Sequence, residues 1–204
     1  MHTEIFTENQ LELLPYLRDF KRSFYMAGGT AVAIHLGHRR SIDFDLFTPV
    51  RLNKTRIKTK LAKIPFDQKP VFEDYDQLHL LLNGVKMTFF NYPFVVLHPL
   101  DVLKAITVPS LLSLAAMKAY ALGRRAKWKD YVDLYFILRD NYSIQEISAE
   151  AEKVFGPLFS EKLFRQQLAF HKDIDYSEPV EFLADMINDD EIKNFLIDKA
   201  TDLY

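Results

Sequence analysis

The stretch that decides the fold is Met26-Ala27-Gly28-Gly29-Thr30, followed after an apolar run by His38-Arg39-Arg40-Ser41-Ile42-Asp43-Phe44-Asp45-Leu46-Phe47-Thr48. The mostly apolar residues 23–27 predict a short buried strand that the glycine pair interrupts. Residues 30–36 are typical of a compact apolar helix, and Gly37 suits the left-handed position after a helix. Residues 42–47 alternate apolar and acidic side chains with the period of a strand. The segment therefore predicts a strand, a glycine turn, a helix and a strand that carries two carboxylates.

The two carboxylates are Asp43 and Asp45. Residues two apart along a strand project from the same face, so both should point together, about 7 Å apart along the chain. Such a pair can hold one or two divalent cations through oxygen ligands, Mg²⁺ by preference or Mn²⁺. Metal ions of this kind bridge the phosphates of a nucleoside triphosphate (NTP) and orient an attacking hydroxyl. The pair therefore indicates a metal site for phosphate chemistry.

The glycine turn supplies the second half of such a site. Gly28 and Gly29 have no side chain to obstruct a phosphate, and a helix that begins near Thr30 offers free backbone N–H groups to an anion. A lone Asp-x-Asp or a lone Gly-Gly is usually only a turn or a strand end. In this order and spacing, the two motifs together predict a cradle for NTP phosphates beside a metal.

The rest of the first half predicts a small mixed sheet with helices. The apolar spacing of residues 11–20 predicts an amphipathic helix that Pro15 bends or shortens, and residues 53–64 predict a basic helix. A further strand is expected at residues 71–75. The strongest hairpin signal is Asn83-Gly84 between apolar residues 78–82 and 85–90, because Asn-Gly supplies the positive φ angles of a tight primed turn.

The character of the chain changes at Pro109-Ser110. Residues 111–125, with Ser110 as N-cap, and residues 129–138 predict two helices, and the remainder of the chain is expected to be helical throughout. We therefore predict an α+β fold with a mixed sheet and flanking helices in residues 1–108, and a helical region in residues 109–204 that completes the active-site cleft.

The amino-acid composition indicates a folded protein without disulfides or a membrane-spanning segment. The chain has 204 residues, of which 49% are hydrophobic and 26% charged, which is enough to bury a core. It contains no cysteine, which excludes disulfides and thiolate metal sites. No apolar run approaches the roughly 20 residues that span a bilayer, and the polar start lacks the features of a signal peptide. We expect a cytoplasmic protein with no membrane partner.

Charge is distributed unevenly although the net charge is only -2. Residues 140–204 hold 15 acidic and 6 basic side chains, whereas residues 1–139 hold 13 acidic and 20 basic ones. The densest basic stretch is the segment from Arg51 to Lys69, hereafter the basic segment. A polyanion such as RNA is a reasonable partner for it. The alternative, a solvated lysine-rich helix face, is about equally common.

Two blocks of sequence carry a family resemblance. Gly28-Gly29-Thr30-Ala31 with His38-Arg39-x-Ser41-x-Asp43-x-Asp45-Leu46-Phe47 resembles the signature of the AbiEii/AbiGii toxin family of nucleotidyltransferase-like proteins, in the polymerase-β-type superfamily. The second block resembles the family's lysine and Lys-Asp-x-x-Asp-Leu-Tyr helices; it comprises residues 114–121 and Arg125-x-Lys127-x-Lys129-Asp130-Tyr131-x-Asp133-Leu134-Tyr135. The matches span roughly residues 24 to 139.

The resemblance implies roles for residues of both blocks. Asp43 and Asp45 are the expected metal ligands and, with Lys118 and Asp130, the expected catalytic residues; the expected nucleotide contacts are Gly28, Gly29, Thr30, Arg39, Ser41, Arg125 and Asp133. On one helical face, Lys118 could reach triphosphate oxygens with Arg125 in support. Asp130 and Asp133 share a face of the next helix and could orient a base or ribose, assist the nucleophile or anchor a basic side chain.

Two features of the first block leave alternatives open. Arg39 and Arg40 could neutralise a substrate phosphate or pair with Asp43 or Asp45. The superfamily commonly has a third carboxylate on the neighbouring strand, where this chain has Thr88. Either two acids suffice, or Asp74 or Asp76 substitutes, or the alignment of that strand is wrong.

The expected activity is Mg²⁺-dependent transfer of a nucleoside monophosphate (NMP) unit from an NTP to an acceptor hydroxyl. The resemblance implies tRNA as the acceptor, a toxin role in a toxin–antitoxin or phage-defence system, and a cognate antitoxin as partner. Two alternatives stay open. One is a nucleotidyltransferase acting on a small molecule or a protein; the other is an inactive nucleotide-binding or interaction module of the same fold.

Overall fold

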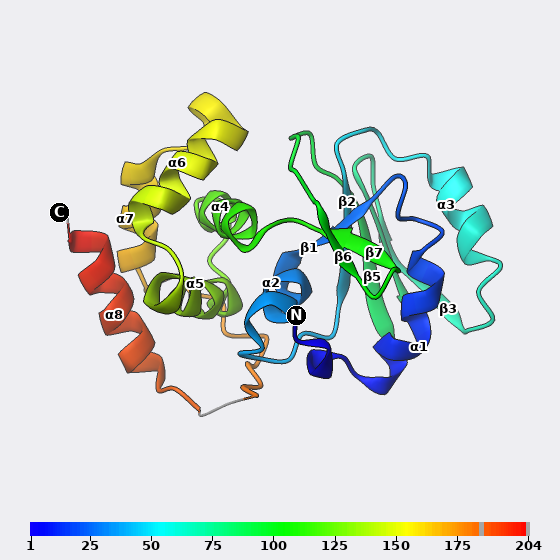
Figure 1. The fold of residues 1–204 in the computed structure, drawn as a ribbon, viewed down its shortest axis with the longest axis horizontal. Helices are drawn as coiled ribbons and strands as arrows, with labels where there is room; N and C mark the ends of the chain where they lie inside the picture. Colours follow the sequence, from blue (N-terminus) through cyan, green and yellow to red (C-terminus); the bar gives the residue numbers. More distant parts are fainter. Residues whose placement is uncertain (184–185, 203–204) are drawn as a thin grey trace.

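The computed structural model describes residues 1–183 and 186–202. A five-stranded sheet with the order β1-β2-β5-β4-β3 occupies one side of the molecule, and helices α4 to α8 occupy the other (Figure 1). Helix α2 lies between these two parts. The predicted α+β fold, with a mixed sheet followed by a helical region, is confirmed. The division of the chain into two domains at residue 108 stays a prediction.

The first elements follow the predicted order. After a short 3-10 turn, η1 (Thr3–Ile5), helix α1 (Glu8–Leu17) begins at a Thr7 capping box and keeps Pro15 inside it. Strand β1 (Tyr25–Ala27) leads directly into α2 (Gly28–Leu36), which starts two residues earlier than predicted. Gly37 ends α2 with a φ of 66°, in the left-handed region. Strand β2 (Phe44–Thr48) and the basic helix α3 (Lys54–Leu61) follow.

The sheet is completed by β3 (Gln68–Glu73), β4 (Gln77–Leu82) and β5 (Val85–Asn91). The Asn83-Gly84 hairpin is confirmed, because φ is 52° at Asn83 and 75° at Gly84, as a primed turn requires. Strand β5 then pairs in parallel with β2, and this register sets Asp45 opposite Thr88. The expectation that Thr88 lies beside Asp45 on the neighbouring strand is therefore confirmed.

A two-stranded ribbon of β6 (Leu100–Val102) and β7 (Ile106–Val108) was not predicted. Each strand is only three residues long, too short to show a period. The helices that follow are α4 (Leu111–Leu122), α5 (Trp128–Asp140), α6 (Ile144–Phe155), η2 (Gly156–Leu158), α7 (Glu161–Ala169) and α8 (Asp189–Thr201). Ser110 caps α4 as predicted, with its side chain accepting from the backbone N–H of Ser113.

The expectation that the chain is helical throughout after residue 140 is wrong for residues 170–183. This segment, hereafter the strap, runs back to the first half as extended chain: Phe182 forms a β-bridge with Arg39, and the backbone N–H of Leu183 donates to the carbonyl of His38. Pro179 removes a backbone donor from the middle of the strap, which disfavours a helix there.

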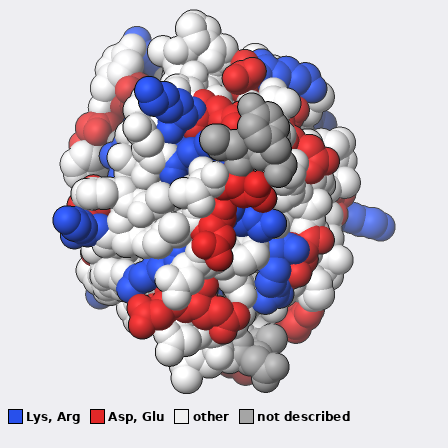
Figure 2. Space-filling view, turned by 90° about the vertical axis from the view of Figure 1, so that its left-hand side faces the viewer, with Lys and Arg blue, Asp and Glu red and all other residues white. Residues whose placement is uncertain are grey.

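The buried apolar side chains of both parts form one cluster, with members from β2 and β5 as well as α4 and α5. No helix of the described residues is long and apolar enough to cross a membrane. On the face built by the C-terminal helices, acidic and basic side chains are intermingled (Figure 2). The acidic excess of the C-terminal third therefore does not make that face uniformly negative.

Candidate active site

A polar cavity of about 390 Å³ lies where the sheet, the start of α2 and the helical region meet. Its wall contains the predicted site residues with the exception of Thr30 and Asp133: these are Gly28, Gly29, Arg39, Ser41, Asp43, Asp45, Lys118, Arg125 and Asp130. The fold thus brings together two blocks that are about 80 residues apart in the sequence. The two remaining residues lie beneath the wall.

Asp43 and Asp45 both face this cavity. Asp45 belongs to β2, whereas Asp43 precedes the strand by one residue, a small correction to the prediction. Burial raises the pKa of both carboxyl groups, and the charge of Asp45 raises that of Asp43 further. The hydroxyl of Thr88 hydrogen-bonds Asp45 and partly offsets this effect on the Asp45 pKa. Two partly desolvated anions side by side are unfavourable alone and are relieved by a cation.

The donor set fits Mg²⁺ or Mn²⁺. Within residues 1–183 and 186–202, no group of three His, Asp or Glu side chains converges to hold a metal. Asp74 and Asp76 do not substitute for a third acid, since Asp74 accepts from backbone N–H groups in the β3–β4 turn and neither residue lines the cavity. Mg²⁺ commonly binds through one or two carboxylates, substrate phosphates and water. Two carboxylates beside Thr88 are sufficient for that mode of binding.

The glycines leave room for the chain's own side chains. A Cβ atom on Gly28 would lie 2.2 Å from Asp45 Oδ2, and one on Gly29 would lie 2.6 Å from Arg39 Nη2. Gly28 also has a φ of 69°, which L side chains rarely adopt. The sequence predicted that the two glycines leave space for a substrate phosphate. The structure shows a further reason for them, because side chains at these positions would collide with the Asp45 carboxylate and the Arg39 guanidinium.

We expect Gly28→Ala to reduce the free energy of unfolding by at least about 1–2 kcal/mol, because a side chain at positive φ is strained and its Cβ would displace Asp45. Urea denaturation measures this loss. Gly123→Ala is the matched control, since φ is -71° there and the nearest atom would be 3.9 Å from the new Cβ. Equal stability of the two variants would contradict the prediction.

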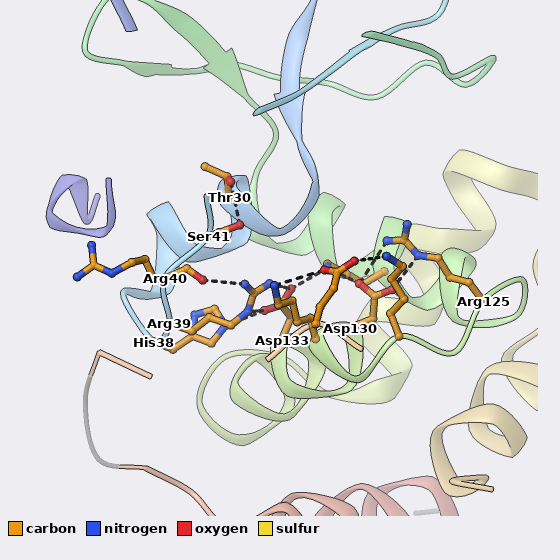
Figure 3. A network of polar contacts seen from close by, with 12 residues as sticks. Thr30, His38, Arg39, Arg40, Ser41, Arg125, Asp130 and Asp133 are labelled. Carbon is orange, nitrogen blue, oxygen red and sulfur yellow. Dashed lines mark hydrogen bonds and ion pairs between the residues drawn. The ribbon is translucent and has the colours of Figure 1, made fainter. Parts of the chain in front are cut away.

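Thr30 is buried below the cavity wall and bonds to the loop before β2. The residue is only 1% exposed, and its hydroxyl donates to the backbone carbonyl of Asp43 at 2.5 Å. The same hydroxyl lies 2.9 Å from the Ser41 hydroxyl (Figure 3). The hydroxyl is thus already engaged within the protein, and the nucleotide contact of Thr30 stays a prediction. Thr30 fixes the loop that presents Ser41 and Asp43 to the cavity.

Asp133 organises the cations below the cavity. The carboxylate is 0% exposed and receives Arg39 Nε at 2.7 Å, Arg39 Nη2 at 2.9 Å, His38 Nε2 at 2.8 Å and Lys118 Nζ at 2.7 Å (Figure 3). Burial alone would raise the pKa of Asp133, but Arg39 and Lys118 outweigh it and hold the pKa well below its usual range. Of the predicted roles, anchoring basic side chains is the one that the geometry favours.

His38 completes this network as a neutral donor. Burial lowers its pKa, and Nδ1 has no hydrogen-bond partner among the described residues. Arg39 therefore pairs with Asp133, not with the metal-site carboxylates, and the neighbouring Arg40 pairs with Glu181 of the strap. The expected pairing of these arginines with Asp43 or Asp45 is wrong, whereas the contact of Arg39, which lines the cavity, with a substrate phosphate stays a prediction.

Asp130 holds two cations at the cavity wall. Lys118 Nζ lies 2.5 Å from Asp130 Oδ1, and Arg125 Nε lies 2.9 Å from Asp130 Oδ2 (Figure 3). Burial opposes ionisation of Asp130, but Lys118 and Arg125 prevail and lower its pKa. Arg125 lies beyond the end of α4, so the predicted shared helical face is wrong, yet the two side chains still converge.

Several cavity residues were not identified from the sequence. Lys86, Lys127, Lys129 and Glu178 line the wall. Glu178, in the strap, forms ion pairs with Lys127 and with Lys129, the latter at 3.3 Å. Lys127 and Lys129 belong to the second motif block and could have been predicted as site residues from it. Lys86 reaches the cavity through the pairing of β5 in the sheet, and Glu178 reaches it from the distant strap, so no local sequence pattern indicates either residue.

The basic segment does not line the cavity. Some of its charge is already paired, since Lys54 and Lys58 both form ion pairs with Glu73. Arg56, Lys63 and Lys69 are exposed and appear in no ion pair of the described residues. A polyanion-binding role for this segment stays a prediction.

Two kinds of similarity agree with the geometry. MenT4, a nucleotidyltransferase toxin from Mycobacterium tuberculosis, has the same fold at a TM-score of 0.64 and 15% identity, with 96% of this chain and 82% of that chain covered. JHP933 from Helicobacter pylori aligns at a TM-score of 0.52 and 15% identity, over 95% of this chain and 88% of that one. At this identity, these structures show the fold alone.

One relative has a higher sequence identity to this chain than these two structures. The Aquifex aeolicus protein aq_aa25 is 33% identical over 140 residues, which make up 65% of this chain and 66% of the relative, just under two thirds of its length. A family model described as nucleotidyl transferase AbiEii toxin, type IV TA system, matches residues 14–202. That match includes both motif blocks, the whole cavity wall and the strap. The chain therefore belongs to the nucleotidyl transferase AbiEii toxin family of type IV TA systems.

Proposed function

We propose that this nucleotidyltransferase moves an NMP unit from an NTP to an acceptor hydroxyl with a divalent cation, Mg²⁺ or Mn²⁺, held by Asp43 and Asp45. The observation that carries the proposal is the pair of carboxylates with raised pKa values in one cavity with Lys118 and Arg125. When bound, such a cation would neutralise phosphate charge and assist departure of pyrophosphate.

The chain's own groups would bind and orient the triphosphate. Lys118 and Arg125 are held in place by Asp130, so their charges are positioned before substrate arrives. Both oxygens of Asp130 are engaged by these cations, which favours a positioning role over proton transfer. Lys86, at the cavity wall, has no ion pair among the described residues and is available to a phosphate. Gly28 and Gly29 present the backbone of the first turn of α2.

The proposed acceptor is RNA, specifically tRNA, with the basic segment as its docking surface. Exposed arginine and lysine side chains attract phosphates irrespective of sequence. Membership of a type IV TA family supports a toxin role and a cognate antitoxin as partner. A cytoplasmic location, where NTPs and RNA are available, is part of this proposal.

The acceptor can be identified by label transfer. The purified protein is incubated with each NTP labelled at the α-phosphate, Mg²⁺ and total RNA, and omission of RNA or replacement of Mg²⁺ by EDTA are the controls. Metal-dependent label on tRNA is the expected result. Label on the protein itself or on a small molecule would favour the alternative acceptors, and NTP binding without any transfer would favour an inactive module.

Removal of exposed charge from the basic segment should weaken RNA binding in a salt-dependent manner. For Arg56→Ala/Lys63→Ala/Lys69→Ala we expect the slope of log K against log salt concentration to fall by about 2, since each lost phosphate contact removes roughly 0.7 for single-stranded regions. Fluorescence anisotropy with labelled tRNA measures the slope. Lys153→Ala/Lys162→Ala/Lys172→Ala, three exposed lysines elsewhere, should leave it unchanged. The same slope in both triple variants would remove the RNA role of this segment.

A further inference from the structure

A second cavity of about 540 Å³ adjoins the active site. The two cavities share Gly28, Phe47, Phe90, Lys118 and Arg125 in their walls. The second cavity differs in character, because most of its remaining wall is aromatic or aliphatic. It lies within the size range of small-molecule sites, and no carboxylate of residues 1–183 or 186–202 lines it. A charged cavity therefore opens directly into an apolar one.

The sheet explains why the two cavities are continuous. Phe47 follows Asp45 by two residues on β2, and Phe90 follows Thr88 by two residues on β5, so each ring lies on the same strand face as the site residue before it. The register pairs Asp45 with Thr88 and Phe47 with Phe90. One strand face thus leads from the proposed metal site to an aromatic pair about 7 Å further on.

The aromatic side chains are arranged as a wall. The ring centroids of Phe47 and Phe90 are 5.2 Å apart, those of Phe47 and Tyr92 are also 5.2 Å apart, and Phe94 lies 5.0 Å from Tyr92. Tyr120 of α4 continues this wall, with its ring centroid 5.3 Å from that of Phe94, and the guanidinium of Arg124 lies 3.5 Å from the centroid of the Tyr120 ring. The planar guanidinium of Arg124 thus already stacks on an aromatic ring of the wall. Among the described residues, the charged groups that line this cavity are all cationic: Lys118, Arg124 and Arg125.

We propose that this second cavity, the aromatic pocket, receives the nucleobase of the donor NTP, an inference that rests on the proposed function. The charged cavity suits a triphosphate, whereas an apolar aromatic wall suits a flat, neutral base that gains by stacking. The short span between Asp45 and Phe47 is comparable to that of the sugar that joins an α-phosphate to its base. Stacking is tolerant of base identity because every base has a π-face.

The experiment separates base binding from phosphate binding. Isothermal titration calorimetry gives the Kd of a non-hydrolysable NTP analogue and of inorganic tripolyphosphate, both with Mg²⁺. Phe90→Leu should weaken the NTP analogue by about tenfold or more and leave tripolyphosphate within about twofold, since stacking on an aromatic ring is lost. Phe90→Tyr keeps the ring and should retain affinity. Phe170→Leu removes an exposed ring outside both cavities and should change neither Kd.

A second variant tests the pocket by filling it from α4. Ala121 lines the aromatic pocket from α4 and not the polar cavity, so Ala121→Phe should fill the pocket and weaken the NTP analogue selectively. An equal effect on both ligands, or no effect in either variant, would overturn the proposal for the aromatic pocket. If the wild-type protein still transfers NMP in that case, the proposed function remains intact. Wild-type protein that binds neither ligand would overturn both.

Discussion

Asp45→Asn should lower the rate of NMP transfer by about 10³-fold or more while leaving the protein folded. The carboxylate lines the polar cavity and is one of the two proposed metal ligands. A bound cation stabilises the developing charge by several kcal/mol, and each 1.36 kcal/mol corresponds to a tenfold change in rate. Label transfer under saturating Mg²⁺ and NTP measures the loss.

Stability provides the internal control for this variant. Burial raises the pKa of Asp45, so its charged form at neutral pH is less favourable in the folded state than in the unfolded state. Replacement by a neutral side chain of similar shape should leave the free energy of unfolding equal or higher. An inactive but stable variant would thus separate a catalytic defect from a folding defect.

Asp76→Asn is the matched substitution outside the cavity. Asp76 is exposed in the β3–β4 turn and does not line the cavity. We expect its activity to stay within about twofold of wild type. Activity retained by Asp45→Asn, or lost in Asp76→Asn, would contradict the assignment of the metal site.

Local signals predicted the elements that place these carboxylates. The Asn83-Gly84 turn fixes the register of β4 against β5 within a few residues, and the alternation of residues 42–47 fixes which face of β2 is buried. Neither local fact sets the parallel register of β2 against β5, so the position of Thr88 beside Asp45 was expected from the family resemblance and not from a local pattern. The short ribbon of β6 and β7 could not be predicted, because three-residue strands carry no period.

The ion-pair network could be predicted only in part. Spacing along α5 places Asp130 and Asp133 on one face, but their cations come from positions far away in the chain, with Arg39 94 residues from Asp133. Which of several arginines reaches which carboxylate depends on the packing of α2, α4 and α5. The strap was missed for the same reason: Glu178 reaches the cavity through tertiary pairing with Lys127 and Lys129, and its own sequence neighbours give no indication of this.

Asp133→Asn should be the most destabilising substitution of the site, with a loss of about 3–5 kcal/mol in the free energy of unfolding. The wild-type carboxylate is fully buried and compensates Arg39 and Lys118, which are themselves buried. An amide of the same shape retains some hydrogen bonds but removes the charge that compensates two buried cations and leaves Asp130 as the acid in direct contact with Lys118. Urea denaturation at pH 7 measures the loss, and displacement of Lys118 should reduce NMP transfer as well.

The matched control is Glu181→Gln, which removes the carboxylate of the exposed pair with Arg40. Exposed ion pairs contribute about 0–1 kcal/mol, so this variant should remain close to wild type. Both substitutions neutralise one acid that pairs with an arginine of the same loop, and they differ mainly in burial. A similar loss in both would show that burial of Asp133 is not the source of its contribution.

The pH dependence gives an independent test of the same assignment. The pKa of Asp133 is held well below its usual range in the folded protein by Arg39 and Lys118 despite burial, whereas an unfolded Asp titrates near 3.9. The stability contributed by its charge is therefore fully present above about pH 4–5 and is lost as the pH falls further towards the folded-state pKa. The difference in unfolding free energy between wild type and Asp133→Asn should stay constant from pH 7 to about pH 5 and shrink below about pH 4. A difference that is unchanged in acid would mean that shape and hydrogen bonding, not charge, account for the role of Asp133.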